Sequence, residues 1–309
     1  MKKILRNIIL ILMIVIMPVK VCAVSTSDAL EVLDVNKESS LTLNYYYDDY
    51  KFNDVGVKIY YIASVDADFK YQLSSDYISY PLKINDIATE YEWNSLVQTL
   101  MSYIEADGIE ETREEIITNN MVSFSGLKPG LYLVKTDKID TEDYTLMFEE
   151  CLLNIPMINE DGTWNYEVTV NPKAEEYIPK YEKITYTVVK EWIDDKSTRP
   201  KSIDIEIYKN GSLVERKILS SENNWTYQWI TDDDGSSWTV VERNIPSNYY
   251  VTISNENRNF VIVNTNLDYK EENPKTLDDI KLYLYLLVGA IMGFVLLAIS
   301  IIIQKKHVE

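Results

Sequence analysis

Three polar residues have types and spacing that could do chemistry inside a folded domain: Lys190, Glu242 and Asn264. Each stands in an alternating run whose residues of the same parity are apolar or aromatic, so alternation directs all three side chains into the core. Burial there lowers the pKa of a lysine and raises the pKa of a glutamate. A neutral amine is a nucleophile, and a protonated carboxyl can polarise an amide. The alternative is that Lys190 reaches solvent and that Asn264 only caps a strand.

These residues belong to a series of short runs rich in Tyr, Val, Ile and Thr and separated by turn residues. The runs cover residues 185–192, 202–209, 213–219, 224–229, 237–242, 249–254 and 259–264. Such spacing favours antiparallel strands packed as a small sandwich. Lys190 lies in the first run and Asn264 in the last, so a bond between them would join the terminal strands.

The preceding half of the chain shows the same alternation and predicts a further β-rich module. One stretch, residues 93–105, has helical spacing instead, with Leu96, Leu100, Tyr103 and Ile104 on one face. We expect this helix to cover a sheet of the first module. The polar residues 174–181, which include a proline, are interpreted as the boundary between modules, and residues 25–37 as a mobile lead-in.

Residues 182–267 resemble the Cna B-type domain of bacterial adhesins and pilins over nearly their whole length. The matching stretches are 189–195, 199–203, 207–211, 223–227, 238–242 and 262–265. The resemblance implies an isopeptide bond between Lys190 and Asn264, formed with loss of one ammonia and with Glu242 as the catalytic acid. Such a bond would tie the first strand to the last and needs no oxidant.

Residues 38–175 resemble the N-terminal domain of Gram-positive pilins, through stretches 126–134 and 164–173. The second stretch fits the pilin motif with Asn171 in place of a tyrosine. The resemblance implies that Lys173 accepts a carbonyl from a neighbouring subunit in a head-to-tail polymer. The alternative is an ordinary solvated lysine. Asn44 and Lys135 stand where a lysine and a glutamate would be needed, so no isopeptide bond is predicted in this module.

The N-terminus has the pattern of a signal peptide over residues 1–23. Lys2, Lys3 and Arg6 precede an apolar run at 8–17, and small residues stand at the cleavage-determining positions before residue 24. The alternatives are an uncleaved anchor and a lipoprotein anchor at Cys22. The latter is disfavoured because Lys20 stands where a small residue is needed.

Residues 282–303 carry no charge and are long enough to cross about 30 Å of hydrocarbon. The tail 304–309 begins with two lysines among its first three residues, which favours the cytoplasmic side. We therefore expect a transmembrane helix followed by a cytoplasmic tail. The alternative is an ordinary single-pass membrane protein, in which the span is never removed.

Before this span, residues 268–281 are interpreted as a wall-spanning linker, and within it residues 273–279 resemble the LPxTG-type sorting signal of sortase substrates. The motif residues are Asn273, Pro274, Lys275 and Thr276, in a variant that opens with Asn-Pro. The resemblance implies that a sortase cleaves between Thr276 and Leu277 and passes Thr276 to an amine of peptidoglycan. Leu277 departs from the usual glycine, which leaves the sortase class open.

Composition excludes several classes of function. The formal net charge of -19 argues against nucleic acid as a partner. Removal of both ends would leave one cysteine, Cys151, and no histidine, because His307 lies in the tail. Cys/His zinc sites and histidine triads are thereby excluded, and no metal or cofactor is predicted. We interpret Cys151 as a buried hydrophobe and the acidic run 232–235 as a hairpin turn rather than a calcium loop.

Taken together, the patterns predict an all-β chain with two immunoglobulin-like, Cna B-type sandwich modules in tandem, the first with a short helical insertion. The predicted function is that of a wall-anchored surface protein, a pilin subunit or accessory pilin, and not a turnover enzyme. The alternative is a monomeric adhesin that binds a host ligand, for which the tyrosine-rich runs 45–47 and 60–61 could serve. A carboxylate-dependent glycosidase is a further alternative, but no pattern places a paired-carboxylate cleft.

Overall fold

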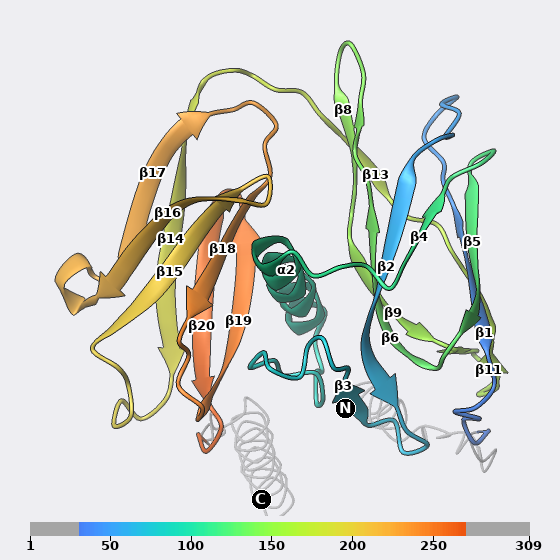
Figure 1. Ribbon diagram of the computed structural model, residues 1–309, viewed down its shortest axis with the longest axis horizontal. Helices are drawn as coiled ribbons and strands as arrows, with labels where there is room; N and C mark the ends of the chain where they lie inside the picture. The colour runs from blue at the N-terminus through green and yellow to red at the C-terminus, as the bar shows by residue number, and fades with distance from the viewer. Residues whose placement is uncertain (1–30, 270–309) are drawn as a thin grey trace, which may run out of the picture.

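The computed structural model describes residues 31–269 (Figure 1). The predicted signal peptide 1–23, sorting motif 273–279, transmembrane helix 282–303 and tail 304–309 lie outside these residues. Within residues 31–269, no helix has the length and apolar character needed to cross a bilayer. The described chain is mostly β-strand, with one α-helix.

The first lobe, defined as residues 31–177, consists of thirteen strands and the helix. Its elements are β1 (Ser39–Asn44), β2 (Gly56–Val65), β3 (Tyr71–Leu73), α2 (Glu90–Asp107), β4 (Arg113–Ile116), β5 (Met121–Leu127), β6 (Gly130–Thr136), β7 (Ile139–Asp140), β8 (Thr145–Phe148), β9 (Cys151–Ile155), β10 (Met157–Ile158), β11 (Trp164–Asn165), β12 (Glu167–Val170) and β13 (Ala174–Tyr177). The main sheets have the orders β12-β1-β5 and β3-β2-β6-β9, with β4 paired to β2. Side chains from both sheets share one core, for example Leu41, Phe124, Ile59 and Leu153.

The second sandwich, residues 183–266, has seven strands, one for each predicted run. These are β14 (Lys183–Ile193), β15 (Ser202–Lys209), β16 (Ser212–Ser220), β17 (Thr226–Asp232), β18 (Trp238–Arg243), β19 (Tyr249–Glu256) and β20 (Asn259–Asn266). They form two sheets, β17-β14-β20-β19 and β16-β15-β18, around one apolar core. The first strand, β14, pairs in parallel with the last, β20. A bond between the terminal strands therefore joins neighbours within one sheet.

Helix α2 is longer at both ends than the predicted 93–105. Its start is fixed by a capping box, in which Thr89 Oγ1 accepts from the Glu92 N–H at 3.2 Å and Glu92 Oε2 accepts from the Thr89 N–H at 3.0 Å. Its end is fixed by Gly108, whose φ of 62° lies in the left-handed region that favours glycine. These signals stand outside the apolar stripe, which is why periodicity alone gave a shorter helix.

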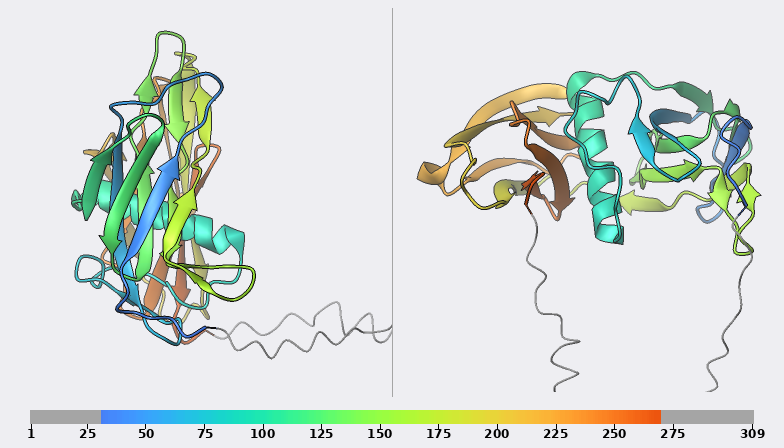
Figure 2. Two further views of the ribbon diagram at one scale, coloured as in Figure 1. Left: turned by 90° about the vertical axis from the view of Figure 1, so that its right-hand side faces the viewer. Right: turned by 90° about the horizontal axis from the view of Figure 1, so that it is seen from below.

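Helix α2 lies between the rest of the first lobe and the second sandwich, as Figure 1 and the right view of Figure 2 show. One face packs on the sheet of the first lobe, where Leu96 and Leu100 join Ile62 and Leu133 in a common cluster. That contact agrees with the expected cover over the first module. The opposite face meets β18 and β19 of the second sandwich, a contact that the sequence did not indicate. The helix thus has two buried faces. The prediction that Tyr103 shares a face with Leu96, Leu100 and Ile104 is wrong, because Tyr103 joins the core of the second sandwich.

Two boundary predictions need correction. The first half of the segment interpreted as the module boundary, Ala174–Tyr177, is strand β13, which pairs antiparallel with β8. Its polar side chains suit an edge strand, where one side faces water. The lead-in 25–37 is also wrong for its described part, because Leu33 is buried and Trp164 Nε1 donates to the Glu31 carbonyl at 2.7 Å.

The contact between α2 and β19 makes a testable prediction at Thr99. Its Oγ1 accepts from the Ile253 N–H at 2.8 Å, a partner 154 residues away. Thr99→Ala would leave this buried N–H unsatisfied and should lower the free energy of unfolding by about 1–3 kcal/mol in chemical denaturation. Ser102→Ala on the same helix is the control, since its hydroxyl donates only to Gln98 within the helix. Equal losses from both substitutions would contradict an interlobe role for Thr99.

Candidate functional site

The structure places Lys190, Glu242 and Asn264 together in the core of the second sandwich. Their exposed fractions are 4%, 1% and 0%. Lys190 and Asn264 come from the neighbouring strands β14 and β20, with Asn264 two positions beyond Ile262, the register partner of Lys190. Glu242 comes from β18 in the facing sheet. The three side chains therefore meet across the space between the sheets, on their inner faces, as the alternation predicted.

Glu242 contacts both of the other side chains. Its Oε2 lies 3.5 Å from Lys190 Nζ, and its Oε1 accepts a hydrogen bond from Asn264 Nδ2 at 2.7 Å. Among residues 31–269, Asn264 Oδ1 has no hydrogen-bond partner. A carboxyl in this position can exchange protons with the amine on one side and with the amide nitrogen on the other. A general acid and base that serves both the amine and the amide needs this arrangement.

The amine of Lys190 is held by backbone and aromatic groups. Its Nζ donates to the Glu191 carbonyl at 2.8 Å and to the Ile262 carbonyl at 3.3 Å. The ring of Trp192 has its centroid 4.2 Å from the same nitrogen. These contacts fix the amine inside the sandwich, so Lys190 does not extend to solvent.

Trp192 is itself held by a group of residues that close this end of the site. Its ring makes edge contacts with Trp225 and Tyr249, and the guanidinium of Arg199 lies 5.2 Å from its centroid. Asp194 anchors the arginine through an N–O contact of 2.6 Å and accepts from the Tyr249 hydroxyl at 2.9 Å. Sequence reasoning matched stretch 199–203 to a family but gave Arg199 no role.

Burial shifts the two titratable groups in opposite directions. Desolvation lowers the pKa of Lys190, and desolvation raises the pKa of Glu242, while their mutual attraction opposes both shifts. The charged pair and the neutral pair contain the same number of protons, so a proton moves between them without exchange with solvent. A drier site favours the neutral pair, which contains the nucleophilic amine and the protonated carboxyl.

The other predicted residues are placed apart from this cluster. Lys173 is exposed at the end of the segment that precedes β13. Lys135 pairs with Glu105 of α2 at 3.0 Å, and Asn44 donates to Asn171 at 3.5 Å. Cys151 is half-buried, and desolvation raises the pKa of its thiol to about 11, which keeps the thiol protonated. The motif residues Asn273, Pro274, Lys275, Thr276 and Leu277 lie outside the described residues.

The acidic run 232–235 lies where β17 ends. Asp234 pairs with Lys209 at 2.7 Å, and Asp233 is buried and accepts from the Tyr177 hydroxyl. Among residues 31–269, no group of three or more potential ligand side chains is arranged to hold a metal ion. The aspartates thus have protein partners, and Asp233 also connects the sandwich to β13.

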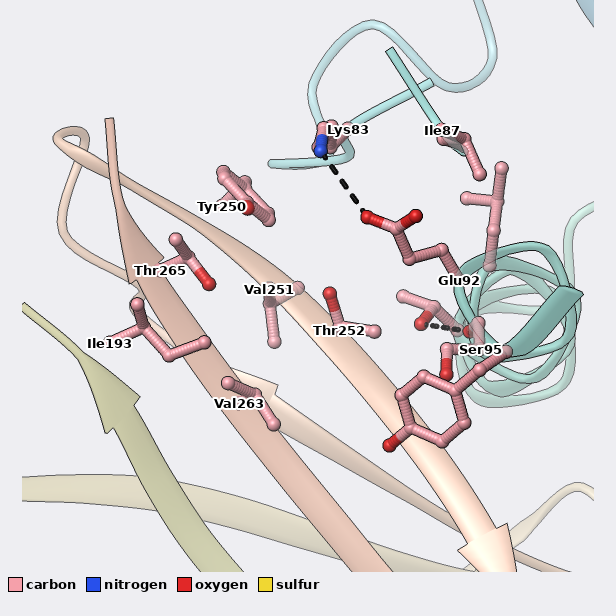
Figure 3. Close-up of a pocket in the computed structure, with 13 residues that line it drawn as sticks. Lys83, Ile87, Glu92, Ser95, Ile193, Tyr250, Val251, Thr252, Val263 and Thr265 are labelled. Carbon is pink, nitrogen blue, oxygen red and sulfur yellow. Dashed lines mark hydrogen bonds and ion pairs between the residues drawn. The ribbon is translucent and has the colours of Figure 1, made fainter. Parts of the chain in front are cut away.

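A pocket of about 170 Å³ opens beside the N-terminal half of α2, on the outer face of β19 and β20 (Figure 3). Lys83 and Glu92 form an ion pair of 3.6 Å at its rim, and Tyr250 and Thr265 project from the sheet. Its lining contains one carboxylate and no cysteine or histidine.

Comparisons with known proteins agree with this geometry at the level of the domain. Residues 184–265 match the family model of the Cna protein B-type domain. The collagen adhesin of Staphylococcus aureus is 27% identical over 127 residues, which are 38% of this chain and 11% of that protein. The match thus spans about a tenth of the length of that curated relative. Residues 184–265 are thus similar to a Cna B-type domain, and the described residues 31–269 are mostly β.

Solved structures are similar at low identity. A single B repeat unit of the collagen-binding surface protein Cna of Staphylococcus aureus is 18% identical, covering 74% of this chain and 98% of that chain, with a TM-score of 0.26. The major pilin SpaD of Corynebacterium diphtheriae is 17% identical, covering 76% of this chain and 65% of that chain, with a TM-score of 0.29.

Because water is excluded from the site, the stability of the protein should depend on pH when the Lys190 amine is removed. In Lys190→Met, Glu242 keeps its burial but loses its cation, so its folded-state pKa stays above the ordinary value of 4.5. A raised folded-state pKa gives stability that is complete below the unfolded-state pKa and is lost as pH rises through the folded-state pKa. The variant should unfold more easily in denaturant at pH 8 than at pH 5. Adding Glu242→Gln should remove this dependence, and a single variant with equal stability at both pH values would show that water reaches the carboxyl.

Proposed function

We propose that the chain is a surface structural protein of a Gram-positive cell wall, a pilin subunit or accessory pilin, whose second sandwich carries an isopeptide bond between Lys190 and Asn264. The observation that carries the proposal is the meeting of Lys190, Glu242 and Asn264 in a buried space within the Cna B-type segment. The bond forms once per molecule, so the chain is not a turnover enzyme.

The reaction follows from the contacts of Glu242. The neutral amine of Lys190 attacks the side-chain carbonyl carbon of Asn264, and a new C–N bond forms. The protonated carboxyl of Glu242 gives its proton to the amide nitrogen of Asn264, and the resulting carboxylate takes the proton that the amine loses. That nitrogen leaves as ammonia, and the carboxyl returns to its starting state. The 2.7 Å contact between Glu242 Oε1 and Asn264 Nδ2 supports this route for the leaving group.

The bond would change how the domain carries load. Pulling on the ends of the sandwich shears β14 against β20, since these parallel neighbours begin and end the domain. A covalent tie between them routes the force around the hydrogen bonds. Closing a loop of this length stabilises the fold by about 4 kcal/mol if the tie acts on the unfolded chain as a disulfide does.

Export and attachment complete the proposal. The signal peptide 1–23 directs secretion, and a sortase cleaves after Thr276 and joins that residue to peptidoglycan. The span 282–303 holds the precursor in the membrane until then. In a polymer, the amine of Lys173 takes the place of the peptidoglycan amine. The exposure of Lys173 supports this role, because an acceptor lysine must be accessible to a sortase that carries the Thr276 carbonyl of a neighbouring subunit.

A monomeric, wall-anchored adhesin that binds a host or matrix ligand is the second candidate. The observation in its favour is the relationship to the collagen adhesin of Staphylococcus aureus. In this case the isopeptide-bearing sandwich would support a binding lobe and would not form part of a shaft. Lys173 would then have no acceptor role.

The isopeptide bond predicts the mass of the protein. Purified residues 24–276, the predicted mature chain, should be lighter than the sequence mass by one ammonia. Lys190→Ala, Glu242→Ala and Asn264→Ala should each remove this deficit. Lys135→Ala is the matched control, because this lysine also pairs with a glutamate but belongs to the other lobe. A wild-type mass equal to the sequence mass would refute the cross-link.

Immunoblots of cell-wall extracts separate the two candidates. A pilin subunit should give a ladder of high-mass bands that Lys173→Ala abolishes and that the control Lys180→Ala, at another exposed lysine, leaves in place. An accessory pilin at the base or tip should appear only in bands that also contain another subunit. A single band for the wild type would favour the monomeric adhesin.

A further inference from the structure

The second sandwich is open on one side, where the two sheets end. β18 is the edge of the sheet β16-β15-β18, and β19 is the edge of the sheet β17-β14-β20-β19. Among the described strands, neither edge has a further partner on this side. Glu242 lies on β18, so an uncovered gap here would bring water close to its carboxyl. The strands of the sandwich alone therefore leave the site unsealed.

Helix α2 of the first lobe covers this opening, in contact with both edge strands (Figures 1 and 2). The backbone of the preceding loop adds a hydrogen bond from the Val251 N–H of β19 to the Pro81 carbonyl at 2.9 Å. Together with the Thr99 contact to Ile253, this bond occupies the free edge of β19. The first lobe thus supplies the missing wall of the second sandwich.

Tyr103 is the residue of α2 that enters the core of the second sandwich. It is 2% exposed and belongs to the same apolar cluster as Val240 and Ile262. Val240 precedes Glu242 by two residues on β18, and Ile262 precedes Asn264 by two residues on β20, so this cluster adjoins the site. Burial raises the pKa of the Tyr103 phenol. Its hydroxyl has no hydrogen-bond partner among residues 31–269. Tyr103 therefore fills space beside the site and adds no bond to it.

Polar contacts from the two residues Glu105 and Asp107, which follow Tyr103 in the helix, hold the helix on the strand that carries Glu242. Glu105 Oε2 accepts from Thr239 Oγ1 at 2.7 Å, and Asp107 pairs with Arg243 at 2.7 Å. Thr239 and Arg243 belong to β18, and Arg243 directly follows Glu242 in the chain. The position of the ring is therefore set relative to the same strand that positions the carboxyl.

We propose that Tyr103 is a positioning residue for the cross-link: as part of α2 it excludes water from the space around Lys190, Glu242 and Asn264, so that the bond in the second sandwich forms only when the first lobe is docked. This inference rests on the proposed isopeptide reaction. Its reason is that water would stabilise the charged pair and so reduce the fraction of neutral amine. Each unit by which the lysine pKa returns toward its ordinary value reduces the neutral amine about tenfold at neutral pH.

The test measures the rate of cross-linking in the full chain. Each variant is translated cell-free at neutral pH and quenched into denaturant at intervals, and the cross-linked peptide that contains Lys190 and Asn264 is quantified by mass after digestion. Tyr103→Ser should slow formation by at least about tenfold. Tyr103→Phe should keep the wild-type rate, because the ring seals the site and the hydroxyl has no partner.

Tyr77→Ser is the matched control. Tyr77 is also 2% exposed, and its hydroxyl also has no partner within residues 31–269, but it packs in the core of the first lobe. The same substitution there costs a similar amount of packing without opening the site, so its rate should stay within about twofold of the wild type. Resistance to limited proteolysis checks that each variant folds. If Tyr103→Ser does not fold, Tyr103→Leu takes its place and should cross-link more slowly than Tyr103→Phe.

The outcomes distinguish this inference from the function on which it rests. A wild-type chain without the cross-linked peptide overturns the proposed reaction, and the role of Tyr103 falls with it. A wild type that cross-links, together with Tyr103 variants that keep its rate, overturns only the role of Tyr103. Equal slowing by Tyr77→Ser and Tyr103→Ser also overturns it, because general destabilisation would then explain both.

Discussion

An ammonium and a carboxylate can be buried in an apolar core only if their loss of hydration is compensated, and one contact between them seldom suffices. Lys190 and Glu242 meet this constraint in the interior of the second sandwich, where both side chains are fully buried. Moving one proton from the amine to the carboxyl removes both charges without changing the number of bound protons. The local environment, more than the pH of the solution, therefore decides whether the amine is a nucleophile. The residues that surround the site therefore influence directly whether the Lys190 amine is neutral.

Much of the second sandwich could be predicted because its strands obey the period of two. Alternation placed Lys190, Glu242 and Asn264 on inward-facing positions, and each of the seven runs corresponds to one strand. Such a pattern is strong when one face of a strand meets a core and the other meets water. It also fixes the register, since a shift of one residue would turn the apolar side chains outward.

The features that could not be predicted from the sequence depend on contacts between residues far apart in the chain. The apolar stripe of α2 indicated that one face was buried, yet Thr99 and Tyr103 contact strands whose residues follow more than a hundred positions later. Periodicity reports that a face is covered and does not say by what. The same reason explains strand β13, whose polar residues resemble a linker until the partner strand β8 is known. Arg199 escaped notice because its role depends on the ring of Trp192 lying beside it.

The two lobes share a topological feature but differ in what stands at the equivalent positions. In the first lobe, β1 pairs in parallel with β12, just as β14 pairs with β20 in the second sandwich. The inward positions of that first pair are occupied by Leu41, Leu43 and Val168, which have no group that can form an amide. Under tension the first pair can resist only through hydrogen bonds and packing, whereas the second would have a covalent tie. If the helix of the first lobe also seals the site where that tie forms, the lobe in which no cross-link is predicted determines whether its neighbour acquires one. The order of folding then becomes part of how the chain gains its strength.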